Sequence, residues 1–157
     1  MGPTRPATLV VFGLGAAALA WLLISAVYYE QNFPPLPWLP AVTIVGLAVL
    51  EGYAAMNTRA RIDRRPGREP VDPLAVARFA VLAKASSLAG SIFAGFYAAI
   101  TGWLIIEPTR AASSDVPAAV AGLVASLALV AAALWLERSC RVPEPPEEEQ
   151  EPGNRRG

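Results

Sequence analysis

Four long apolar windows constrain the fold of this chain more than any other feature. Each window has about 20 residues or slightly more and at most one charge, which suits an α-helix that crosses a hydrocarbon core of roughly 30 Å. The windows cover residues 7–29, 38–57, 81–106 and 116–136. A soluble domain of 157 residues would need only short apolar segments to fill its core. The sequence therefore predicts an all-α integral membrane bundle of four transmembrane helices.

The cations are distributed unevenly between the connecting segments, and this predicts the orientation of the spans. The segment YEQNFPPLP, between the first two spans, has no cation, and the segment between the last two has only Arg110. The central segment is a basic loop that contains Arg59, Arg61, Arg64, Arg65 and Arg68. Because positively charged loops stay in the cytoplasm, we expect a multi-pass plasma-membrane protein with both termini inside. The simplest role of the basic loop is to set topology and attract anionic lipid.

Prolines indicate where the helices begin and end. Asp72 is a predicted N-cap, and Pro73 suits the first helical position. The third helix should then extend from Pro73 to Ile106, roughly 51 Å at 1.5 Å per residue. Since this exceeds the core thickness, we expect its first turns to leave the membrane or the helix to tilt. The Pro/Glu-rich tail, residues 143–157, is predicted to be disordered, which leaves residues 1–142 as the membrane domain.

Missing residue types exclude several kinds of chemistry. The chain has no histidine and a single cysteine, Cys140. A disulfide within the chain, a zinc site of His and Cys ligands, and Ser–His or Cys–His catalysis are therefore excluded. We expect no cofactor, no metal site and no enzymatic activity. Cys140 follows the fourth span directly, so lipidation is one interpretation, although an inert thiol is the simpler one.

Glu51 interrupts the second apolar window. Counted from Trp38, it lies roughly 20 Å along the helix, within the hydrocarbon core. An ionised carboxylate facing lipid costs several kcal/mol, so Glu51 should face other helices and be paired or protonated. Lys84 is the candidate partner, because we expect the second and third spans to be antiparallel neighbours with both residues near their cytoplasmic ends. The alternative is a Lys84 that extends to the headgroups. A hydrogen bond from Ser87 or Ser91 to Glu51 is a third arrangement.

Small residues recur at every fourth position of the third span, in two series. One series is Ala83, Ser87, Ser91, Gly95 and Ala99, and the other is Ser86, Gly90, Ala94, Ala98 and Gly102. Small side chains let helix backbones approach closely, which favours helix association in lipid. We therefore expect the third span to be the central helix, with Ser87, Gly90, Ser91 and Gly95 as its packing residues. A substrate groove lined by the serines is the alternative.

Three segments resemble an uncharacterised actinobacterial family of four-span membrane proteins, the domain of unknown function 3180. They are PPLPW (34–38), RARIDRRPGREPVDPLAVARFAVLAKASSLAGSIFAGFYA (59–98) and LWLERSCRVP (134–143). The resemblance covers nearly the whole chain apart from the acidic tail. It implies a small integral membrane protein with no established activity and no established catalytic residues. Genes of this family often lie near folate-biosynthesis genes, which implies a metabolic context without a defined role.

Two functions are compatible with this architecture. The first is a non-enzymatic accessory or scaffold protein that acts through helix packing, with the lipid bilayer, a second copy or another membrane protein as its partner. The second is a subunit of a small-molecule or proton-coupled transporter, in which Glu51 binds the proton or substrate and a homodimer encloses the space that four spans alone do not. No glycine-rich phosphate loop or nucleotide fingerprint accompanies the basic loop, so we expect no nucleic-acid partner.

Overall fold

The computed structural model describes residues 4–27, 36–62, 73–106 and 110–140, and all four segments are built around a long α-helix. The helices are α1 (Pro6–Val27), α2 (Leu39–Ile62), α3 (Pro73–Ile106) and α4 (Arg110–Ser139). Each is long and apolar enough to cross a membrane. The predicted class, all-α with four membrane-spanning helices, is therefore confirmed. The predicted acidic tail lies outside the described residues.

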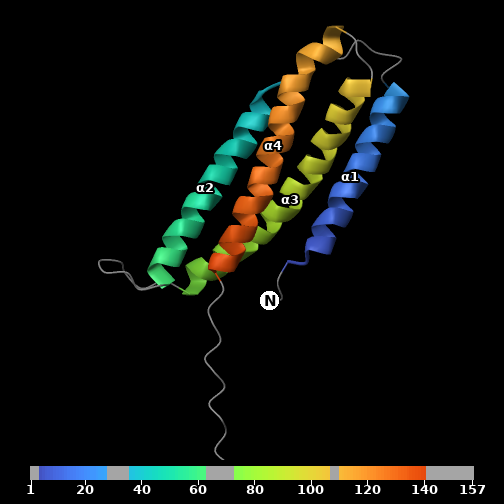
Figure 1. Ribbon diagram of the computed structural model, residues 1–157. Helices are drawn as coiled ribbons and strands as arrows, with labels where there is room; N and C mark the ends of the chain where they lie inside the picture. Colours follow the sequence, from blue (N-terminus) through green and yellow to red (C-terminus); the bar gives the residue numbers. More distant parts are fainter. Residues whose placement is uncertain (1–3, 28–35, 63–72, 107–109, 141–157) are drawn as a thin grey trace, which may run out of the picture.

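Proline positions explain where the helices begin. α3 begins at Pro73 and ends at Ile106, which are the predicted ends. α1 likewise has a proline, Pro6, at its first position, where the missing N–H is not needed for the helix. α4 differs from the predicted span because it begins at Arg110 and contains Pro117 internally. An internal proline removes one backbone hydrogen bond and crowds the preceding turn, and the first turns of α4 bend away from the rest of the helix (Figure 1).

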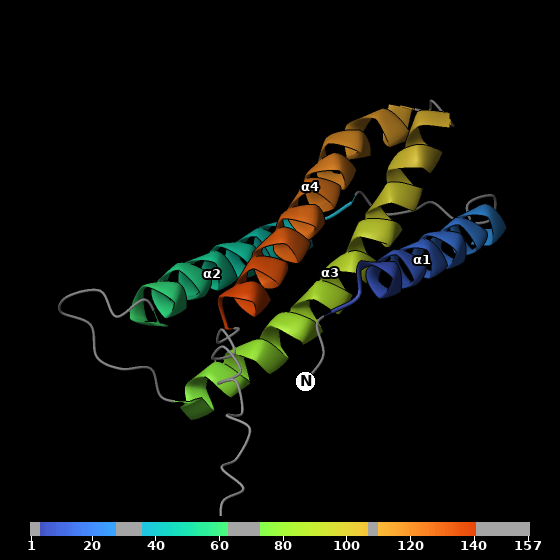
Figure 2. The same ribbon diagram turned by 60° about the horizontal axis from the view of Figure 1, so that its bottom comes forward.

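The four helices alternate in direction and form a row in the order α2, α4, α3, α1 (Figure 1). α3 packs against α1 and α4, and α4 packs against α3 and α2. A view turned by 60° shows the same order, with the start of α3 extending past the start of α1 (Figure 2). α3 therefore shares the centre of the molecule with α4. The expectation that α2 and α3 are neighbours along their length is wrong, because α4 is the helix on which α2 packs.

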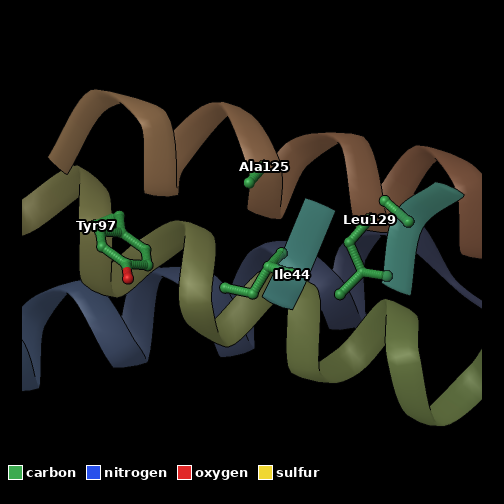
Figure 3. Packing of buried hydrophobic residues seen from close by; sticks show 5 residues of the cluster. Ile44, Tyr97, Ala125 and Leu129 are labelled. Carbon is green, nitrogen blue, oxygen red and sulfur yellow. The ribbon is translucent and has the colours of Figure 1, made fainter. Parts of the chain in front are cut away.

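Small side chains dominate the core, so the helices lie close together. One cluster joins three helices and contains Ile44 and Ala48 of α2, Tyr97 of α3, and Ala125 and Leu129 of α4 (Figure 3). A second cluster joins the same helices nearer the end of α2, through Ala55, Ala83 and Leu136. The helices also approach closely beside Tyr97, where a methyl group added at Gly122 of α4 would overlap the phenol ring.

Two hydrogen bonds connect the ends of the row to α4. The backbone N–H of Leu36, before α2, donates to Asp115 Oδ1 at 3.1 Å. At the other end of α4, the backbone N–H of Thr4 donates to Glu137 Oε1 at 2.8 Å, and Thr4 precedes α1. Asp115 and Glu137, near the two ends of α4, thus hold the segments that precede the two outer helices of the row, α2 and α1.

Candidate functional site

The candidate site is built on one face of α2, which presents a stripe of buried residues to its neighbours. The spacing of the stripe alternates between three and four residues, the spacing of one helix face. Its members are Ala41, Ile44, Ala48, Glu51, Ala55 and Thr58. Glu51 thus occupies a packing position on α2. Its burial follows from the helical register together with the docking of this face on α4.

The carboxyl group of Glu51 is enclosed by protein. The residue is 2% exposed, and both carboxylate oxygens are buried without a hydrogen bond among the described residues. The Ser86 hydroxyl of α3 lies beside the carboxyl, but it does not reach either oxygen with hydrogen-bond geometry. One turn along the stripe, Ala55 packs with Ala83 and Leu136. Glu51 therefore lies in a buried contact where α2 meets the two central helices.

Lys84 lies elsewhere, so the structure does not bring the proposed pair together. Lys84 lines a cavity between α1 and α3, on which the side chains of Arg5 and Thr8 also border. The physical reason is the order of the helices. Since α2 packs on α4 instead of running along α3, the two residues project toward different neighbours. The direct Glu51–Lys84 contact weighed from the sequence is not formed.

The serines that were considered as partners of Glu51 bond to their own helix. The hydroxyl of Ser87 donates to the carbonyl of Lys84 at 3.0 Å. The hydroxyl of Ser91 donates to the carbonyl of Leu88 at 2.8 Å. Both residues are buried. The serine that does lie beside Glu51, Ser86, belongs to the second series of small residues, which the sequence did not indicate as a partner of Glu51.

The two series of small residues on α3 contact two different helices. Ser91 and Gly95 face α1: a methyl group at Gly13 would lie 3.1 Å from the carbonyl oxygen of Ser91, and one at Gly95 would overlap the Gly13 carbonyl. Gly90 faces α4, where an added methyl would lie 3.3 Å from the Ser126 carbonyl oxygen. The predicted packing residues are thus used within the molecule, on both sides of α3.

Part of the basic loop falls within the described residues. Arg59 and Arg61 form the last turn of α2, where cations interact favourably with the helix dipole. Arg59 is exposed and Arg61 is half-buried. Arg64, Arg65 and Arg68 lie outside the described residues. Arg59 and Arg61 therefore lie at the end of α2, past the contact that holds Glu51.

The end of α4 carries the remaining chemically reactive group, Cys140. Its backbone N–H donates to the carbonyl of Leu136 at 3.0 Å, which continues the last turn of the helix. Burial, and secondly the negative charge of Glu137, raise the pKa of the Cys140 thiol. A raised pKa lowers the fraction of reactive thiolate. Among the described residues, no three His, Cys, Asp or Glu side chains cluster closely enough to hold a metal ion.

Comparison with known proteins adds the family. No curated protein and no solved structure matches the chain. The family model DUF3180, described as a protein of unknown function, matches residues 9–144. This range includes all of α2, α3 and α4 and most of α1. The chain therefore belongs to the DUF3180 family, and it is a multi-pass membrane protein.

Proposed function

We propose that this member of the DUF3180 family is a non-enzymatic accessory or scaffold protein of the plasma membrane. It acts through lateral packing of its helices with a second copy or with another membrane protein. The observation that carries the proposal is the enclosure of Glu51, whose carboxylate oxygens are both buried in a contact between helices. A carboxyl that serves transport needs access to water or substrate, and this one has none in the described arrangement.

The edges of the row are where a partner would pack. α1 and α2 each pack extensively on one helix only, and their outer faces expose large apolar side chains. On α1 these include Val10, Val11, Leu14 and Leu22, and on α2 they include Val42, Val49, Leu50 and Met56. Because lipid and protein are equally apolar, association at these faces depends on close fit.

Site-specific photo-crosslinking in intact membranes tests this proposal. A benzophenone amino acid is placed at Leu14 of α1, at Leu50 of α2 and, as a control, at Leu127 of α4. All three side chains are exposed. The proposal expects a discrete protein adduct from an edge helix and lipid adducts alone from Leu127. Lipid adducts alone at all three positions would contradict a role that depends on lateral protein contact.

A second candidate function, a subunit of a proton-coupled or small-molecule transporter, is favoured by one feature of the same residue. Glu51 has neither an ion pair nor a hydrogen bond among the described residues, and intramembrane carboxyls without partners commonly belong to transport sites. Proton flux into liposomes that contain the wild type, Glu51→Gln or Asp115→Asn separates the two functions. Flux above that of empty liposomes that disappears only with Glu51→Gln supports transport, and wild-type flux no higher than that of empty liposomes supports the scaffold.

A further inference from the structure

A cavity of about 320 Å³ lies between α1 and α3, at the end of the molecule where α1 begins. It is separate from the contact that holds Glu51, and its lining combines charge with hydroxyl groups. Two cations border it, Arg5 just before α1 and Lys84 on α3. Thr4, Thr8 and Ser87 add three hydroxyls, and Leu9 and Leu88 supply an apolar wall. The lining thus has a polar and an apolar part.

The polar part of the lining suits an anion that has several oxygen acceptors. Arg5 and Lys84 provide charged donors. The Thr4 hydroxyl is buried without a hydrogen bond among the described residues, so it has a donor to offer. The first turn of α1 adds the positive end of a helix dipole. One carboxylate is nearby, because Glu137 Oε1 accepts the backbone N–H of Thr4 at 2.8 Å. Glu137 thereby holds this segment in place, and its single carboxylate leaves a net positive charge beside the two cations of the lining.

The position of the cavity along the helices specifies the ligand further. Thr4 and Arg5 directly precede the apolar span of α1, which begins at Pro6. The cavity therefore lies at the level where a span meets the headgroups. Leu9 lies four residues after Arg5, and Leu88 lies four residues after Lys84, which itself falls in the first third of the span Leu74–Ile106. Basic pockets between transmembrane helices at this level bind anionic headgroups.

We propose that this cavity binds a phosphate group, carried by the headgroup of an anionic phospholipid or by a soluble phosphate ester. Arg5 and Lys84 hold the phosphate oxygens, the Thr4 and Thr8 hydroxyls donate to them, and Leu9 and Leu88 contact the adjoining apolar part of a lipid. This site is independent of the scaffold proposal, because it uses the α1–α3 side of the row.

Native mass spectrometry of the full-length protein in detergent tests the site. Short-chain phosphatidylglycerol and phosphatidylcholine are titrated in turn, and inorganic phosphate and glycerol 3-phosphate are added as competitors. The variants are Arg5→Gln, Lys84→Gln and their combination. Arg138→Gln is the matched control, because Arg138 is an exposed cation at the same end of the molecule that does not line the cavity. Arg5→Lys together with Lys84→Arg keeps both charges and tests for rescue.

The expected result is preferential binding of phosphatidylglycerol that weakens by about 5-fold in each single variant and about 30-fold in the double variant. Arg138→Gln should change it by less than about 2-fold, and the charge-conserving pair should retain it. No competition by inorganic phosphate or glycerol 3-phosphate identifies the lipid as the source. Competition by either, with the same dependence on Arg5 and Lys84, identifies a soluble phosphate ester.

A Thr8→Trp variant provides an independent test that leaves both cations in place. Thr8 is exposed to the cavity and to solvent, so the indole fills the cavity without disturbing the core. Thr8→Trp should also abolish the preferential binding. The proposal is overturned if phosphatidylglycerol and phosphate bind equally well to wild type, the double variant and Thr8→Trp. It is also overturned if Arg138→Gln weakens binding as much as the double variant does.

Discussion

Glu51 holds a position on α2 where every other member of the buried stripe is Ala, Ile or Thr. Desolvating a carboxyl is unfavourable unless a hydrogen bond or an ion pair compensates. Neither carboxylate oxygen has a hydrogen bond among the described residues. The buried carboxyl of Glu51 therefore lowers the stability of the fold relative to an apolar side chain at the same position.

Replacement of Glu51 by leucine should stabilise the protein. The substitution keeps roughly the same volume and removes a polar group without compensation, so we expect about 1 kcal/mol or more of added stability. Reversible unfolding in mixed detergent and dodecyl sulfate micelles measures the change. Ala55→Leu, one turn along the same stripe and fully buried, is the control, and overpacking there should cost about 1–3 kcal/mol. A large loss of stability in Glu51→Leu would indicate that the carboxyl has a partner.

Cys140 should react slowly with thiol reagents at neutral pH. Its pKa is raised above the ordinary value of 9.0 by burial and by Glu137, and only the thiolate is nucleophilic. The rate of iodoacetamide labelling should therefore rise with pH to a midpoint above 9.0. Glu137→Gln should lower that midpoint, because the amide removes the charge while it still accepts a hydrogen bond from Thr4. A midpoint unchanged by Glu137→Gln would attribute the shift to burial alone.

At the scale of the helices, the contact between α1 and α3 depends on glycine more than on side-chain interdigitation. Gly13 and Gly95 bring the two backbones together near the middle of both helices. Toward the end of α1, Trp21 and Trp103 pack edge to face, with ring centroids 5.3 Å apart. Such aromatic pairs add about 0.5–1.5 kcal/mol beyond the area that they bury. α1 is therefore held by a close backbone contact and by one aromatic pair.

Replacement of Gly95 by alanine should loosen α1. The added methyl would overlap the carbonyl of Gly13, and relief of such overlap costs about 1–3 kcal/mol. Gly15→Ala is the matched control on α1, because nothing lies within 4 Å of a methyl added there. The control should be neutral or gain up to about 1 kcal/mol from helix propensity. The same unfolding assay compares the two, and equal effects would contradict the close approach at Gly95.

At the scale of the whole molecule, the row of helices separates segments that are adjacent in the sequence. α1 and α2 are consecutive, yet they lie at opposite edges (Figure 1). Each central helix buries two faces, while each edge helix packs extensively on one neighbour only. This arrangement leaves large apolar faces on both edges, as expected where lipid or another membrane protein covers them.

Paired cysteines should confirm the order of the helices. In a Cys140→Ser background, Ala48→Cys with Ala125→Cys should crosslink readily, because both residues belong to one core cluster between α2 and α4. Gly15→Cys with Gly46→Cys should not, because these glycines lie on the two edge helices and each faces open space. Mobility on non-reducing gels after mild oxidation in membranes gives the result. Crosslinking of the second pair instead of the first would contradict the row.

Particular residues show how much of the fold and of the candidate site could be predicted from the sequence. The length and apolarity of the four windows predicted four spans, and Pro73 marked the start of α3. These signals are local, since a helix satisfies its own backbone hydrogen bonds and lipid requires that it does so. The series of small residues on α3 also predicted that this helix would pack closely, but not which helix each series would contact.

The composition and local pattern of the chain determined that it is an all-α membrane protein, where its helices lie in the sequence, and that Glu51 falls within a span. The tertiary structure alone decided that α2 packs on α4, that Glu51 lies beside Ser86 and apart from Lys84, and that Lys84 shares a cavity with Arg5. The physical reason is that the order of helices in a row depends on how their faces fit. Four apolar helices joined by short loops can be ordered in several ways, and only close contacts such as Gly95 with Gly13 and Gly122 with Tyr97 select one.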